Sequence, residues 1–230
     1  QITPSAREFF DVIYLPLGSH IPGVAGVVLP PVVFDSERAR VAALLATAAS
    51  EGATQALVTN LGHISLARDT GLAVHGDFRL NVTGTQGFPS AVAALEAVGI
   101  ADVIVSPELS LPQIRDISGD VSAIVYGRIP LMILEKCVGR ELTGCEACRR
   151  GRVVLKDRRG IDFPVLREFD HRSVIYNSLP TCMSERQGEL DSAGILGRHF
   201  VFSVESPQEV DTVIRAFRDG RPLEGKVRRI

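Results

Sequence analysis

Short apolar segments alternate with helix-like segments over the first 135 residues of the chain. The apolar segments are rich in β-branched residues and are expected to be buried strands, at residues 12–17, 24–33, 55–59, 73–78, 102–105 and 122–126. Continuous apolar runs are typical of parallel strands covered on both faces. The intervening residues 36–51, 64–69, 89–98 and 111–117 carry helix start signals or helix-forming composition. This alternation predicts βα units and a parallel sheet.

The pattern changes after Cys148. Residues 153–157, 163–169 and 173–177 are short strand-like runs separated by turn residues, which favours antiparallel pairing. Residues 199–204 return to a buried-strand pattern, and residues 206–219 begin with Ser206 and Pro207 as a helix start. The fold class we expect is α/β: a partial or distorted TIM-like (β/α) barrel with a small β-rich, cysteine-bearing insertion.

Three segments make up the predicted organisation: βα barrel units at 1–136, the cysteine-bearing insertion at 137–182 and a final βα unit at 183–230. No Gly-x-Gly-x-x-Gly follows a strand, which favours a barrel over a dinucleotide-binding sheet. A complete eight-stranded barrel usually needs about 250 residues. With 230 residues and about seven barrel-type strands, we expect a fragment of a longer chain.

Composition narrows the classes of function. The net charge of −2 gives no global attraction to nucleic acid, and no apolar run approaches the roughly 18 residues needed to span a membrane. The N-terminus has no secretory leader pattern, so we expect a cytoplasmic protein with reduced thiols. One basic cluster, Arg149 to Arg159, is either a solvated face or a contact for an anion or an RNA backbone.

All four cysteines lie in the second half of the chain, and three of them are close together. Cys145 and Cys148 form a C-x-x-C, and Cys137 precedes them by a short loop. Two residues between cysteines let both sulfurs reach one ion or cluster. We therefore expect a zinc site or an iron–sulfur cluster with a fourth ligand from farther along. The alternatives are a disulfide with a spare thiol, or small buried side chains without a special role.

Polar side chains follow the predicted strands at their carboxyl ends, where a β/α barrel carries its active site. The set consists of Asn60, His63, His75, Asp77, Asn81, Glu108 and Arg128. His63 or His75 together with Asp77 could supply a base and its orienting group, although no serine is marked as a nucleophile. Arg128 could bind a carboxylate or phosphate through its planar fork, or pair internally with Glu108 or Glu135.

Several short motifs in a fixed order resemble peptidase family U32, the collagenase-like proteases. The first group is Asn60-Leu61-Gly62-His63, His75-Gly76-Asp77-Phe78-x-Leu80-Asn81, Ser106-Pro107-Glu108-Leu109 and Tyr126-Gly127-Arg128-x-Pro130-Leu131-Met132. The second is Glu135-x-Cys137, Cys145-x-x-Cys148, Lys156-Asp157-Arg158-x-Gly160-x-x-Phe163-Pro164 and Ile175-x-Asn177-Ser178-x-Pro180. The resemblance covers about residues 10 to 220.

The resemblance implies a TIM-like barrel and an enzyme with a cysteine-ligated site. The activity it implies is that of a U32 peptidase, a hydrolase acting on peptide or protein. Some relatives are instead iron–sulfur proteins needed to hydroxylate RNA bases or the ubiquinone ring, which makes RNA or a small aromatic molecule the alternative substrate. A third hypothesis is a non-catalytic interaction module with a structural metal. The sequence leaves open whether the chain forms a homo-oligomer or is part of a longer parent chain.

Roles are predicted for individual residues: for those at the strand ends from their position, for Cys137, Cys145 and Cys148 from their match to the cysteine pattern of the family, and for Cys182 from its place farther along this chain. The catalytic candidates are His63, His75, Asp77 and Glu108; the substrate-binding candidates are Asn60, Asn81 and Arg128; the metal ligands are Cys137, Cys145, Cys148 and Cys182. Many relatives have a cysteine where this chain has His171, so His171 is the alternative fourth ligand. On family grounds a 4Fe–4S cluster is expected in preference to zinc.

Overall fold

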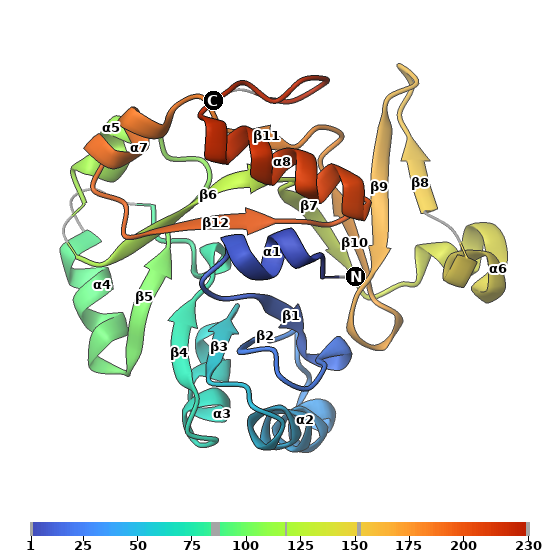
Figure 1. Ribbon diagram of the computed structural model, residues 1–230. Coiled ribbons are helices and arrows are strands. Elements are labelled where there is room, and N and C mark those ends of the chain that lie inside the picture. The colour runs from blue at the N-terminus through green and yellow to red at the C-terminus, as the bar shows by residue number, and fades with distance from the viewer. Residues whose placement is uncertain (1, 84–87, 118, 151–152, 229–230) are drawn as a thin grey trace. The chain divides into compact units, whose positions relative to one another are not determined.

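The computed structural model describes residues 2–83, 88–117, 119–150 and 153–228, without the side chains of residues 88–91, 143 and 146–150. The chain forms two compact units (Figure 1). Unit 2 consists of Arg7–Ile124 and Gly188–His199, and unit 1 of Gln1–Ala6, Val125–Gln187 and Phe200–Ile230. The chain passes from one unit to the other inside two helices, α1 (Pro4–Phe9) and α7 (Gln187–Ser192), and inside two strands, β6 (Val121–Gly127) and β12 (Gly197–Val201).

A parallel sheet is the framework of unit 2. Its first five strands are β1 (Tyr14–Pro16), β2 (Gly26–Val28), β3 (Gln55–Val58), β4 (Ala73–Gly76) and β5 (Ile100–Ile104). They pair in chain order and continue to β6, each parallel to the next. This confirms the predicted mixed α/β class and its parallel strands, and the arrangement is consistent with part of a β/α barrel.

Helices cover the sheet of unit 2 between the strands. The α-helices are α2 (Arg38–Ser50), α3 (Ile64–Arg68), α4 (Phe88–Ala97) and α5 (Leu111–Arg115), and the short 3₁₀ helices are η1 (Leu17–Ser19), η2 (Asp35–Glu37), η3 (Leu61–His63) and η4 (Phe78–Leu80). Helix α3 packs on β3 and β4, and α4 packs on β5 (Figure 1). The apolar positions of α2 recur at helical spacing, so Val41, Leu45 and Ala48 are buried on one side of this helix.

Unit 1 contains a four-stranded antiparallel sheet. Its strands β7 (Pro130–Leu134), β8 (Val153–Lys156), β9 (Asp162–Arg167) and β10 (Ser173–Tyr176) lie in the order β7-β10-β9-β8. The antiparallel pairing that the sequence predicted after the cysteines is confirmed. The cysteine segment also contains a helix that the sequence did not predict, α6 (Val138–Arg150), and a 3₁₀ turn, η5 (Phe169–His171).

The remaining elements complete the chain. They are α1 (Pro4–Phe9), β11 (Thr181–Cys182), α7 (Gln187–Ser192) and α8 (Pro207–Asp219). Ser206 caps α8 by accepting a hydrogen bond from the Glu209 backbone N–H, as its sequence predicted. Phe217 of α8 contacts Phe200 edge-on, with ring centroids 4.5 Å apart, and this pair contributes to the core of unit 1. None of the helices in the described part of the chain has the length and apolar character needed to cross a membrane.

Candidate functional site

Three side chains on neighbouring strands of unit 2 form one hydrogen-bonded network. Asp102 of β5 binds Nδ1 of His75 of β4 through its Oδ1 atom. Its other oxygen, Oδ2, accepts a hydrogen bond of 2.7 Å from the hydroxyl of Ser122 in β6. Parallel pairing of β4 with β5 and of β5 with β6 brings the three side chains together. We refer to them as the His75–Asp102–Ser122 network.

The position of Asp102 follows from the strand that carries it. Ile100 and Ile104 of β5 are buried, and Asp102 lies between them at the two-residue spacing that places side chains on one face of a strand. An acid in an otherwise apolar strand is stable only with hydrogen-bond partners. His75 and Ser122 supply one partner for each carboxylate oxygen. The orientation of Asp102 is therefore fixed from both sides.

The network favours an ionised carboxylate beside a neutral or charged imidazole. Burial alone would raise the pKa of Asp102, but hydrogen bonds from His75 and Ser122 and the nearby charges of His75 and His199 together lower it below its ordinary value. An ionised carboxylate only accepts hydrogen bonds, so Nδ1 of His75 carries a proton. In the described part of the chain, Nε2 of His75 has no hydrogen-bond partner, and 21% of the side chain is exposed. This nitrogen can exchange a proton with a ligand.

A second polar pair lies nearby in the same unit. The hydroxyl of Tyr14 in β1 donates a hydrogen bond to Oε1 of Gln55 in β3. Burial, and after it the charge of Asp102, raises the pKa of Tyr14 well above its ordinary value. Tyr14 therefore keeps its proton and remains a hydrogen-bond donor at every physiological pH.

Sequence reasoning did not identify Asp102, Ser122 or Tyr14 as site residues. It offered Asp77 as the orienting carboxylate of His75, whereas the structure pairs His75 with Asp102. The sequence feature that could have identified Asp102 is an acid inside an apolar strand. Its pairing with His75 could not be predicted, because it depends on the register of two strands distant in sequence.

Asp77 and His63, the other predicted acid–base candidates at strand ends, are buried. Asp77 caps η4 by accepting the backbone N–H of Arg79 at 3.0 Å, and it binds the Arg79 guanidinium at 2.9 Å. His63 ends η3, and its Nδ1 atom is buried without a hydrogen-bond partner in the described part of the chain. Burial, followed by the charge of Arg38, lowers the pKa of His63. Neither residue is hydrogen-bonded to His75.

The amide and acid candidates lie on the surface of unit 2. Asn60 caps η3 by accepting the backbone N–H of Gly62 at 2.9 Å, and Asn81 ends η4 in a left-handed conformation with φ 56°. The Glu108 backbone N–H is held by the Ser106 hydroxyl at 3.4 Å, and its side chain is exposed. Each of these residues therefore stabilises a local turn, and the predicted substrate-binding or catalytic roles stay predictions.

Arg128 has internal partners in unit 1. Its Nη1 atom donates hydrogen bonds to the backbone oxygens of Asn177, at 3.2 Å, and Ser178. Its Nε atom lies 3.8 Å from Oε1 of Glu205, close enough for an ion pair but too far for a hydrogen bond. The sequence suggested Glu108 or Glu135 as an internal partner of Arg128. The structure shows Glu205 in that place instead, and Glu135 binds Arg172 at 2.8 Å.

The cysteines of unit 1 differ in their surroundings. Cys137 is half-buried, Cys145 is exposed, and both are free thiols. Cys145 follows Gly144, whose φ of 77° and ψ of 160° interrupt α6, so the second helical stretch starts at Cys145. Cys182 is buried in β11 opposite Tyr126, and its sulfur lies 3.4 Å from the Ser184 hydroxyl.

The side chain of Cys148 lies outside the described residues, as do those of Arg149 and Arg150 and the whole of Arg152. Within the described part of the chain, no group of three or more His, Cys, Asp or Glu side chains is arranged to hold a metal ion. The free thiols of Cys137 and Cys145 fit zinc or an iron–sulfur cluster chemically, because thiolates are soft ligands that both centres favour.

His171, the alternative fourth ligand, is in the turn between β9 and β10. Asp170 and His171 have φ of 52° and 69°, and the Arg172 N–H donates to the Phe169 carbonyl at 3.3 Å, which is the pattern of a type I′ hairpin turn. Two residues later, the Ser173 hydroxyl accepts the backbone N–H of Val138 at 3.0 Å. The turn that carries the exposed His171 is thus held close to the start of α6 by the bond between Ser173 and Val138.

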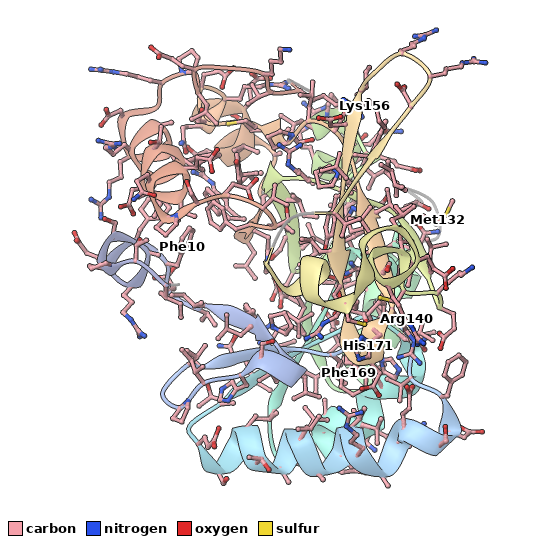
Figure 2. The ribbon with its side chains drawn as sticks, turned by 90° about the vertical axis from the view of Figure 1, so that its right-hand side faces the viewer. Phe10, Met132, Arg140, Lys156, Phe169 and His171 are labelled. Carbon is pink, nitrogen blue, oxygen red and sulfur yellow. The ribbon has the colours of Figure 1, made fainter. Side chains whose placement is uncertain are left out.

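The described part of the basic cluster is on the β8–β9 hairpin. Arg158 and Arg159 are exposed at the turn, where Asp157 accepts the backbone N–H groups of Arg159 and Ile161 at 2.8 and 2.9 Å. Lys156, labelled in Figure 2, pairs with Asp162 at 2.7 Å. Two exposed arginines on one hairpin turn are compatible with either a solvated surface or an anion contact.

Comparison with curated proteins and with solved structures gives no match. The sequence profile of peptidase family U32 matches residues 25–219, which include every strand from β2 to β12. The match spans the His75–Asp102–Ser122 network and all four cysteines. The chain therefore belongs to peptidase family U32.

Proposed function

We propose that this U32 protein is a hydrolase of peptide bonds, and that His75, oriented by Asp102, is its acid–base residue. The observation that carries the proposal is the bond between His75 Nδ1 and Asp102, which leaves Nε2 of His75 without a partner in the described residues. A base held in one tautomer by a carboxylate is a recurring requirement of acyl transfer. The proposed setting is the inner face of a partial TIM-like barrel.

The reaction needs only water and the imidazole at this position. Nε2 of His75 takes a proton from a water molecule, whose oxygen attacks the carbonyl carbon of the peptide. The C–N bond then breaks with its electron pair on nitrogen, and His75 returns the proton to that nitrogen. The products are a carboxylic acid and an amine. Asp102 keeps its position because Ser122 holds its second oxygen at 2.7 Å.

Substitution of the two central residues tests this function. We expect His75→Gln and Asp102→Asn each to lower kcat on labelled gelatin and internally quenched peptides by about 10²–10⁴-fold, with little change in KM. The matched control is His20→Gln, because His20 also faces a carboxylate, that of Glu51 at 3.3 Å, away from the network. Equal activity of wild type and both variants, or no peptide hydrolysis by any of them, would contradict the proposal.

A second candidate function is redox chemistry at a cysteine-ligated centre, and the free thiols of Cys137 and Cys145 favour it. Cys137, Cys145 and Cys148 would hold an iron–sulfur cluster or zinc, with Cys182 or His171 as the fourth ligand. A cluster would supply electron transfer for hydroxylation of an RNA base or an aromatic ring. Cys182 is already engaged with Ser184 in the interior, whereas His171 is exposed near the start of α6, which favours His171 as the fourth ligand.

Metal analysis separates these possibilities. We expect anaerobically purified protein to contain iron and sulfide with a broad absorbance near 400 nm, a region typical of such clusters. Cys137→Ser, Cys145→Ser and His171→Ala should each lower the iron content several-fold, while Cys182→Ser leaves it nearly unchanged. A colourless protein with one zinc ion per chain would support the structural metal instead. If Cys182→Ser alone removes the metal, the assignment of His171 is wrong.

A further inference from the structure

A second histidine, His199, lies beside the His75–Asp102–Ser122 network. It is carried by β12, which pairs with β6, the strand of Ser122. The backbone N–H of Leu196, just before β12, donates to the Val121 carbonyl at 2.8 Å, next to Ser122. All of these residues belong to unit 2. Residues more than seventy positions apart in the sequence therefore meet at one point of the sheet.

Gly197 makes room for this arrangement. A Cβ atom added at Gly197 would lie 2.5 Å from the Ser122 hydroxyl oxygen and 3.6 Å from Nε2 of His199. The hydroxyl and the imidazole therefore both approach the same side of the β12 backbone. The first distance is shorter than any real contact of a Cβ atom, so only glycine permits Ser122 to reach Asp102 in its present position.

His199 has electrostatic neighbours but no hydrogen bond. The described residues give its imidazole no hydrogen-bond partner, although it is only partly exposed. Burial lowers the pKa of His199; the carboxylates of Asp102 and Asp77 oppose this shift, and His75 adds to it. Asp77 itself is bound to the Arg79 guanidinium. The imidazole is therefore neutral near pH 7, with one N–H to donate and no acceptor for it among the described residues.

We infer that His199 is a second substrate-contacting residue of this site and that its neutral imidazole donates a hydrogen bond to the carbonyl oxygen of the scissile peptide. The inference rests on the proposed hydrolysis, for which His75 supplies the base but no donor for the developing oxyanion. A fixed N–H that bonds more strongly as charge develops on oxygen lowers the barrier. A neutral imidazole can serve as such an electrophile. Ser122 and Gly197 act as positioning residues, because they set the places of Asp102 and His199.

Two substitutions at His199 distinguish a donor from a packing residue. His199→Leu removes the N–H and should lower kcat on quenched peptides by about 10²–10³-fold with KM changed less than about threefold. His199→Gln keeps an N–H donor and should retain at least a tenth of the wild-type kcat. Gly197→Ala, which displaces the Ser122 hydroxyl from Asp102, should fall between them. Equal losses in the Leu and Gln variants, or full activity in the Leu variant, would overturn the role of His199.

Nuclear magnetic resonance of the imidazole nitrogens gives a readout that does not depend on turnover. We expect His199 to be mostly neutral at pH 6.5, where a free histidine is half protonated. A peptidyl aldehyde, whose hydrate mimics the tetrahedral state, should shift the ring signals of both His75 and His199. If the aldehyde shifts both signals but no peptide is cleaved, the reaction proposed above fails and the site assignment survives. If peptides are cleaved and the signals of His199 do not move, the site assignment fails alone.

Discussion

His63 is an imidazole that the fold buries without completing its hydrogen bonds. Only 4% of the residue is exposed, and its Nδ1 atom has no partner in the described structure. An unsatisfied buried polar atom costs about 1–3 kcal/mol of stability. The same burial makes protonation of His63 unfavourable in the folded state, so this residue connects stability to pH.

Acid should therefore destabilise the protein through His63. The folded-state pKa of His63 is lowered from 6.5, so the unfolded chain binds more protons once the pH falls towards that value. We expect stability to be fully present above about pH 7.5 and to decrease as the pH falls through about 6.5. His63→Leu should raise the free energy of unfolding at pH 7.5 by about 1 kcal/mol and reduce the loss on acidification. Urea unfolding of both proteins at pH 7.5 and 5.5 measures this.

The pH dependence of stability distinguishes burial of His63 from a catalytic role of this residue. A catalytic role predicts loss of turnover at constant pH, whereas the burial of His63 predicts a change in the slope of stability against pH. The same slope in wild type and in His63→Leu would show that other groups cause the acid sensitivity. His199 is the other histidine whose pKa the structure lowers, and it provides the comparison.

At the scale of single residues, the sequence identified His75 as a candidate for the site, but it did not identify Asp102 and Ser122, which complete the network. The sequence places His75 at the end of a strand, where functional residues gather, and this position follows from the apolar pattern alone. The identity of its carboxylate partner requires the register between β4 and β5, which contains an irregularity between Val74 and Gly76. No local pattern encodes that irregularity.

The hairpin turn between β9 and β10 is an element built from unusual residues. A type I′ turn needs positive φ at both central positions, and glycine is the residue that adopts it without strain. Here the two positions are Asp170 and His171, at φ 52° and 69°. A left-handed conformation costs a residue with a side chain about 1–2 kcal/mol. The cost is consistent with selection of His171 for a purpose other than stability.

Replacement of His171 by glycine tests this interpretation. We expect His171→Gly to raise the free energy of unfolding by about 1 kcal/mol, because glycine relieves the strain at φ 69°. Bound iron or zinc should decrease in the same variant if His171 is the fourth ligand. The matched control is Gly160→Ala in the β8–β9 hairpin, where φ is 78° and the change should destabilise by a similar amount. A destabilised, metal-replete His171→Gly would contradict both expectations. Thermal unfolding and metal content measure them.

Other elements differ from their predictions for local reasons. Residues 24–33 were expected to form one strand, but only Gly26–Val28 pairs, since Pro30 and Pro31 lack the N–H that a ladder needs. Helix α6 has no apolar stripe and is broken at Gly144, so the sequence carried no periodic signal for it. Strand β11 contains only two residues, too few for any pattern.

For the molecule as a whole, the parallel sheet was predictable from the sequence. Apolar runs and helix signals alternate regularly enough to predict β1 to β6 in chain order. The two compact units are discontinuous in sequence, with boundaries inside α1, β6, α7 and β12. A boundary inside a continuous helix or strand produces no change of composition, so no sequence pattern marks these points, and the organisation into three segments stays a prediction.

Pairing of β12 with β6 also has a consequence for synthesis on the ribosome. Strand β6 is complete at Gly127, but β12 begins only at Gly197. At translation rates of roughly 5–20 residues per second, the edge of β6 waits several seconds for its partner. Over that interval β6 can pair with β5 on one side, but its other edge lacks β12, and an open strand edge is a template for association with other nascent chains. The yield of folded protein should therefore respond to the speed of translation between these two strands and to chaperones that bind nascent chains.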